Sequence, residues 1–178
     1  MTITKHDRDY VFELALAITV AASMLLYGIG KPTQFSNTII FQKKIADLTG
    51  MELMWAFYGY TKTYPVIIGV FEIIGGLLLV VGKTRIIGAG ILTAILLNVI
   101  LQDVFYGVNE GALKAAMIYQ LLIVVILYCR RKLLLATVGF YLQQIKTTTV
   151  TFKKQTLLVV IGFVVAVGFK IIESFLTH

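Results

Sequence analysis

The chain has 178 residues, of which 58% are hydrophobic and only 14% are charged, and its mean hydropathy is +0.89. A soluble domain carries about 25% charged residues, so this composition excludes a solvated globule, a disordered tail and a collagen-like fibre. The single cysteine, Cys129, excludes a disulfide framework and a cysteine-ligated zinc site, and the net charge of +7 indicates basic loops on the cytoplasmic side of a membrane.

Five stretches are long and apolar enough to cross a bilayer, which takes about 20 residues of helix. They cover residues 11–31, 65–82, 86–107, 113–129 and 157–175. Lys5 and Arg8 precede the first stretch, but it is too long for the core of a signal peptide and no cleavage site follows, so we expect a retained anchor. The predicted fold class is all-α, a polytopic membrane helix bundle.

Two connections between these stretches are more than turns. Residues 33–64 are rich in aromatic side chains and predict a short interfacial or re-entrant helix that caps the outer end of the bundle. Residues 133–156 mix apolar and basic residues and predict an amphipathic helix on the cytoplasmic leaflet, with residues 147–151 as a linker. The expected organisation is a transmembrane bundle over residues 1–132, the amphipathic connection over 133–156, and an additional transmembrane helix over 157–178.

Lysine and arginine are distributed unevenly over the loops. The N-terminus, the second connection and the fourth connection together hold ten of the sixteen. Because basic loops stay in the cytoplasm, we expect a cytoplasmic N-terminus, an external C-terminus and a place in the bacterial inner membrane.

No catalytic motif is present that would identify an enzyme. Residues 76–84 resemble a phosphate-binding P-loop, but five residues rather than four separate the two glycines, and the stretch lies in a membrane span. Nucleic-acid binding has no support, because aromatic and basic residues are not interleaved. The two histidines, near the termini, make no metal or haem pocket, so no intrinsic cofactor is expected.

Polar residues within the spans fall at similar depths, in the outer half of the membrane. The rise of a helix places in one slab the side chains of Ser23, Tyr27, Glu72, Asn98, Gln102, Gln120 and Lys170. Gly69, Gly75 and Gly76 surround Glu72 on its helix and allow close helix packing. In the inner half, only Glu13 is ionisable, and we expect it to reach the boundary.

Two explanations of this layer stay open. Intramembrane polar groups are functional candidates, and Glu72 is the strongest of them. The alternative is that the layer holds helices together through hydrogen bonds and an ion pair between Glu72 and Lys170. Lys170 is also placed to reach outward next to Glu173, and Cys129 is expected to be structural.

The segments 54–62 and 69–79, the latter with Glu72 before a glycine pair, resemble the DoxX-like membrane proteins. The ending of the first span at Lys31 and the Thr84-Arg85 pair are also similar to that family. The resemblance covers residues 11–130 and implies a four-helix bundle in which Lys31, Glu72, Gly75 and Gly76 are the family-marked positions. It also implies a role in thiosulfate oxidation to quinone, in membrane oxidoreductase complexes, or in chaperoning membrane proteins.

Three functions follow from these expectations. The leading one is a non-autonomous, redox-associated subunit that binds a small lipophilic ligand such as a quinone around Glu72, Tyr27 and Gln102. The expected partners of this subunit are membrane lipid and an oxidoreductase or other membrane protein. The second is a scaffold or assembly factor without catalytic activity. The third is a proton-coupled transporter, which needs ionisable groups at several depths. Ligand identity, catalysis and oligomeric state stay open.

Overall fold

The computed structural model describes residues 3–36, 42–144 and 151–177, and nearly all of them are helical. The helices are α1 (Lys5–Gln34), the short 3-10 helix η2 (Ile45–Asp47), α2 (Gly50–Gly59), α3 (Thr63–Val80), α4 (Arg85–Tyr106), α5 (Glu110–Cys129), α6 (Arg131–Gln144) and α7 (Phe152–Thr177). Among the described residues, α1, α3, α4, α5 and α7 are long and apolar enough to cross a membrane. The predicted all-α class is confirmed, and the chain is a multi-pass membrane protein.

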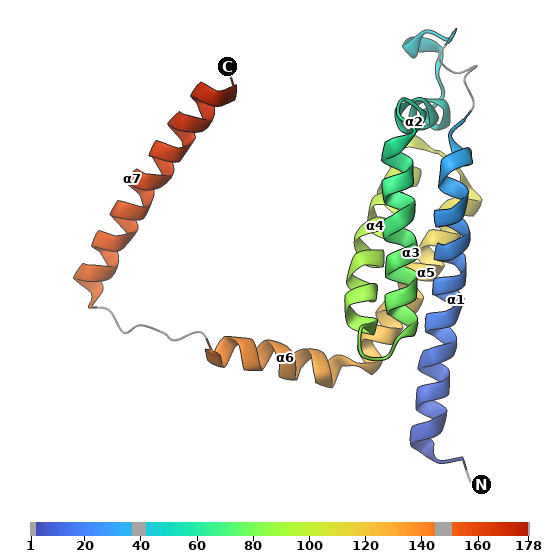
Figure 1. The fold of residues 1–178 in the computed structure, drawn as a ribbon, viewed down its shortest axis with the longest axis horizontal. Coiled ribbons are helices and arrows are strands. Elements are labelled where there is room, and N and C mark those ends of the chain that lie inside the picture. The colour runs from blue at the N-terminus through green and yellow to red at the C-terminus, as the bar shows by residue number, and fades with distance from the viewer. Residues whose placement is uncertain (1–2, 37–41, 145–150, 178) are drawn as a thin grey trace. The chain divides into compact units, whose positions relative to one another are not determined.

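Four of these helices form a bundle (Figure 1). Helix α1 packs against α3 and α5, and α4 packs against the same two helices. Neighbouring helices in this ring run antiparallel because the connections between α3 and α4 and between α4 and α5 are short turns. Helix α2 contacts α3 and α4 where α3 begins and α4 ends. We call this end of the bundle the α2 end, and the opposite end, where α4 begins, the Arg85 end.

The interior of the bundle is built from small and medium apolar side chains. Its core consists of Ala17, Val20, Met24, Leu79, Ala89, Leu92, Leu96, Ala116, Ile123 and Ile126. Large apolar side chains such as Leu26, Ile29 and Phe105 are instead mostly exposed on the outer faces. In a bilayer these faces contact lipid, so the helices are held together mainly by close packing and polar contacts.

Glycines bring α1 and α3 together near the α2 end. A methyl group at Gly69 would lie 2.6 Å from the carbonyl oxygen of Gly28, and one at Gly28 would lie 2.6 Å from the carbonyl oxygen of Gly69. The Gly28 carbonyl lacks the usual helical hydrogen bond, because the residue four positions later is Pro32, which has no N–H. Farther along α3, Gly75 meets Leu92 of α4 and Gly76 meets Ala21 of α1. The predicted packing glycines therefore face two different neighbours.

Side-chain caps fix the helices around the α2 end. Thr49 and Glu52 form a capping box at the start of α2, in which the Thr49 hydroxyl accepts from the Glu52 N–H at 3.3 Å. Lys43 also pairs with Glu52, and these contacts lower the pKa of the Glu52 carboxyl to about 2, the lysine contact being the largest cause. Gly107 ends α4 with a φ of 59°, a left-handed conformation that suits glycine.

The chain divides into two units, Met1–Leu135 and Ala136–His178. The first contains the bundle, and its end lies close to the expected boundary at residue 132. The second contains most of α6 and all of α7. Helix α6 occupies the first part of the predicted amphipathic connection, whereas all but Thr151 of the predicted linker at 147–151 lies outside the described residues.

Candidate functional site

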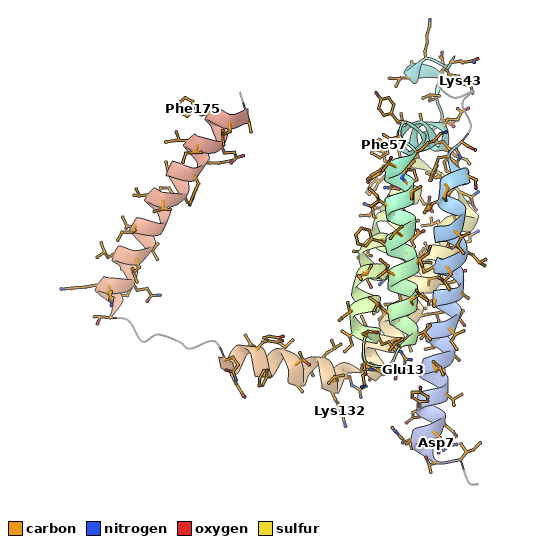
Figure 2. All side chains as sticks on the ribbon, in the orientation of Figure 1. Asp7, Glu13, Lys43, Phe57, Lys132 and Phe175 are labelled. Atoms are coloured by element: carbon orange, nitrogen blue, oxygen red, sulfur yellow. The ribbon has the colours of Figure 1, made fainter. Side chains whose placement is uncertain are left out.

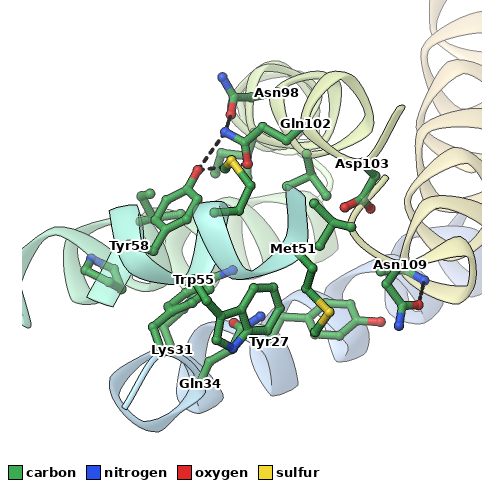
Figure 3. A pocket seen from close by; sticks show the side chains of 18 of the residues that line it. Tyr27, Lys31, Gln34, Met51, Trp55, Tyr58, Asn98, Gln102, Asp103 and Asn109 are labelled. Atoms are coloured by element: carbon green, nitrogen blue, oxygen red, sulfur yellow. Dashed lines mark hydrogen bonds between the residues drawn. The ribbon is translucent and has the colours of Figure 1, made fainter. Parts of the chain in front are cut away.

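A cavity of about 650 Å³ opens at the α2 end of the bundle. Its walls come from α1, α2, α3, α4 and α5 and from the segments that connect them (Figure 3). Ligand sites have volumes of about 300–1,000 Å³, with mostly apolar walls and a few convergent polar groups. This cavity has the same character, so it is the candidate site of the bundle.

Aromatic rings form one wall of the cavity. The ring of Phe35 lies 5.1 Å from that of Trp55 and stacks at 4.9 Å on that of Tyr58. Tyr58 also stacks on Tyr64 at 5.7 Å. The Lys31 ammonium lies 5.9 Å from the centre of the Phe35 ring. The aromatic segment 33–64 therefore contributes a short helix, α2, at one end of the bundle, and this helix also covers a cavity.

A hydrogen-bonded group joins α2 to α4 beside this wall. The Tyr58 hydroxyl lies 2.7 Å from Nε2 and 2.9 Å from Oε1 of Gln102, and the same Nε2 donates to Asn98. Burial raises the pKa of Tyr58, so its hydroxyl keeps its proton, which it donates to Oε1 of Gln102. Tyr27, Asn98 and Gln102, three of the predicted site residues, line the cavity.

Glu72 lies beneath the cavity and pairs with Lys31. Its Oε1 is 3.2 Å from the Lys31 ammonium, and the residue is only 3% exposed. Lys31 lines the cavity but Glu72 does not, so the carboxylate acts on the cavity through the lysine. The partner of Glu72 in the bundle is thus Lys31, which the sequence analysis did not pair with it; Lys31 lies one turn from Gly28, where α1 closely approaches α3.

The other predicted site residues lie outside the cavity walls. The Ser23 hydroxyl donates at 3.1 Å to the Thr19 carbonyl of its own helix, a common arrangement for serine inside helices. Gln120 donates to the Thr93 hydroxyl at 3.4 Å and links α5 to α4. Lys170 belongs to the second unit and pairs with Glu173 at 2.8 Å. The sequence analysis had placed Lys170 next to Glu173 as one of its two alternatives.

Asp103 is a cavity residue that the sequence analysis missed. It lies in the last turn of α4, lines the cavity and is 7% exposed. Its Oδ2 is buried and has no hydrogen-bond partner in the described part of the chain. The available signal was its position directly after Gln102, inside the third predicted span, where a carboxylate is costly.

A second polar cluster closes the Arg85 end. Arg85 is fully buried, and its Nη1 lies 2.7 Å from Oε1 of Glu13 (Figure 2 labels Glu13 at this end). Its other nitrogens donate to the carbonyls of Leu79 and Val80, each at 2.8 Å, which satisfies the last turn of α3. Arg130 also donates to Glu13. The sequence analysis did not predict these partners: the Glu13 carboxylate is held by Arg85 at the start of α4 and by Arg130 at the end of α5.

Both clusters act through hydrogen bonds and charge. In residues 3–36, 42–144 and 151–177, no three histidine, cysteine, aspartate or glutamate side chains gather as metal ligands would. The cavity instead combines an ammonium, a phenol and an amide with one unpartnered carboxylate, and such a set binds and orients an organic molecule through hydrogen bonds.

Comparison with known proteins adds a relative of undetermined function. The chain is 27% identical over 106 residues to the uncharacterized protein YwoB of Bacillus subtilis, a match that covers 58% of this chain and 68% of that protein. No family model matches the chain, and no solved structure matches it.

Proposed function

We propose that this protein binds a small lipophilic, quinone-like molecule in the cavity at the α2 end and serves as a non-autonomous membrane subunit beside a redox partner. The observation that carries the proposal is the cavity of about 650 Å³, whose aromatic wall lies next to the polar groups of Lys31, Tyr58 and Gln102. A planar ring fits against Phe35 and Trp55 through stacking.

A donor group on the cavity wall suits the carbonyl oxygens of such a ring. The ammonium of Lys31 has protons beyond the one directed at Glu72. The Tyr58 hydroxyl accepts from Nε2 of Gln102 and donates to its Oε1, so Tyr58 presents its ring and hydroxyl oxygen to the ligand. Glu72 balances the charge of Lys31, which makes the lysine tolerable below the membrane surface. In this proposal Glu72 is therefore a positioning residue, and Lys31 and Tyr58 contact the ligand.

We also propose the family and the orientation that the sequence indicates. Membership of the DoxX-like proteins would cover residues 11–130, which include the four bundle helices. With the N-terminus in the cytoplasm, the α2 end and its cavity open toward the outer face. Reporter fusions after Lys146 and after His178 test this directly, because the first should be cytoplasmic and the second external.

Trp55 offers a direct binding assay, since it is the only tryptophan in the chain and it lines the cavity. Duroquinone added to the purified protein in lipid nanodiscs should quench Trp55 fluorescence to saturation. The variant Ala112→Phe, which adds a ring to the cavity wall, should weaken this binding by about tenfold or more.

The matched control is Ala15→Phe, which places the same ring on an exposed position of α1 outside the cavity wall. It should bind as the wild type does. Quenching that rises linearly without saturation, and equally in wild type and Ala112→Phe, would contradict the proposal and favour the scaffold function.

A further inference from the structure

Asp103 is a cavity residue with a buried carboxylate oxygen that has no partner in the described part of the chain. It is 93% buried, and neither a hydrogen bond nor an ion pair reaches its Oδ2 from the described residues. A buried acceptor without a partner is unfavourable, and native proteins retain few of them. Such a group indicates a partner that arrives from outside the chain.

Two other buried oxygens without partners differ from this one. Glu72 has an unpartnered Oε2, but its Oε1 pairs with Lys31. Gln120 has an unpartnered Oε1, but its Nε2 donates to Thr93. Neither residue lines the cavity, whereas Asp103 does. Of these three residues, only Asp103 also lines a space that a ligand can occupy.

The cavity has donors and an acceptor at different places on its wall. Figure 3 shows Tyr58 and Gln102 together on one side and Asp103 on another, near Asn109. The Asn109 side-chain oxygen is already used, because it accepts from the Ala112 N–H at 2.9 Å. An ionised carboxylate only accepts hydrogen bonds. A ligand that accepts from the Lys31 ammonium on the cavity wall and donates at Asp103 therefore satisfies both groups.

We infer that Asp103 recognises a hydrogen-bond donor of the bound molecule, so that the cavity prefers a hydroquinone to the quinone of the same carbon skeleton. This inference rests on the proposed function and specifies its ligand. Both oxygens of a quinone are acceptors, and one of them would face the carboxylate oxygens of Asp103 unfavourably. A hydroquinone has hydroxyl groups, each of which donates as well as accepts, so it satisfies both groups.

The test uses calorimetric titration of the protein in nanodiscs with three probes that share one ring. They are duroquinone, durohydroquinone kept reduced under anaerobic conditions, and the dimethyl ether of durohydroquinone, which has the same ring and oxygens but donates no hydrogen bond. Wild-type protein should bind the hydroquinone about tenfold or more tightly than the ether or the quinone.

Variants at Asp103 locate the preference. Asp103→Leu should bind the hydroquinone and the ether with similar affinity, and its affinity for the ether should equal that of the wild type. Asp103→Asn retains a carbonyl acceptor and should keep an intermediate preference. Asp9→Leu makes the same substitution at an exposed position of α1 outside the cavity wall and should change nothing.

The outcomes separate the two proposals. Equal affinity of the wild type for hydroquinone and ether would overturn the role of Asp103 and leave the ligand cavity standing. A preference that persists in Asp103→Leu would also overturn it. If none of the three probes binds to the wild type, both the proposed function and this inference fail. The wild-type comparison needs no variant, so poor accumulation of Asp103→Leu does not prevent a decision.

Discussion

Replacing Gly69 by alanine tests the contact on which the position of Lys31 depends. The added methyl would lie 2.6 Å from the Gly28 carbonyl oxygen and 2.9 Å from Cγ of Lys31. Carbon–oxygen contacts of this kind begin at about 3.3 Å, so α1 and α3 must separate by about 0.7 Å. Overpacking of this size lowers the free energy of unfolding by about 1–3 kcal/mol, and the higher helix propensity of alanine offsets up to about 1 kcal/mol of that loss. We expect the free energy of unfolding to fall by about 1–2 kcal/mol.

Gly30→Ala is the matched control on the same helix as Gly28. No atom lies within 4 Å of a methyl group at Gly30, so this variant should be neutral or slightly more stable than the wild type. Unfolding by SDS titration in mixed micelles, followed by circular dichroism, measures both variants. Gly69→Ala should also weaken duroquinone binding, because Lys31 moves with α1. Equal stability of Gly69→Ala and Gly30→Ala would refute the close approach of α1 and α3.

Three further predictions concern the charged pairs. Glu72→Gln leaves the Lys31 ammonium without a countercharge and should lower the free energy of unfolding by about 1–3 kcal/mol in the same SDS titration. Adding Lys31→Met should restore part of the lost stability, and a double variant less stable than Glu72→Gln alone would contradict the pairing. Glu13→Gln should be more damaging, by about 3 kcal/mol, because one carboxylate serves two arginines, and wild-type stability in this variant would show the cluster to be dispensable. The pKa of Glu52 is about 2 instead of 4.5, so the stability that this carboxylate contributes is complete above pH 4.5 and is lost as the pH falls through about 2. Lys43→Met should raise the pKa of Glu52 in a carboxyl NMR titration, and an unchanged pKa would contradict the ion pair.

Periodicity and length predicted the helices because a bilayer imposes both. Five apolar stretches gave five helices, and their ends differ from the predicted ones by a few residues where polar caps extend them. The first helix, for example, begins at Lys5 rather than residue 11, since Thr4 and Asp7 form a capping box ahead of the apolar part. The aromatic density of residues 33–64 likewise predicted a short helix between the first two spans, and α2 is that helix.

Partner choice was not predictable in the same way. Depth arithmetic places Glu72 near Lys170 and leaves Lys31 at the end of the first span, whereas the close approach of α1 and α3 at Gly28 and Gly69 brings Lys31 to the carboxylate. Depth also says nothing about rotation around a helix axis. That rotation directs Glu13 toward two arginines at the helix ends.

The two ends of the bundle use charge in opposite ways, and this contrast indicates where function resides. At the Arg85 end, the guanidinium of Arg85 has a carboxylate and two backbone carbonyls as partners, so its buried donors are satisfied by the protein itself. At the α2 end, Asp103 is almost as buried, but it lines a cavity and has a carboxylate oxygen that no described residue satisfies. A satisfied buried network stabilises and fixes the packing, whereas an unsatisfied group beside open space lowers stability until a ligand binds. Ligand binding should therefore raise the stability of the protein through the α2 end, and the Arg85 end should hold the helices in place while that happens.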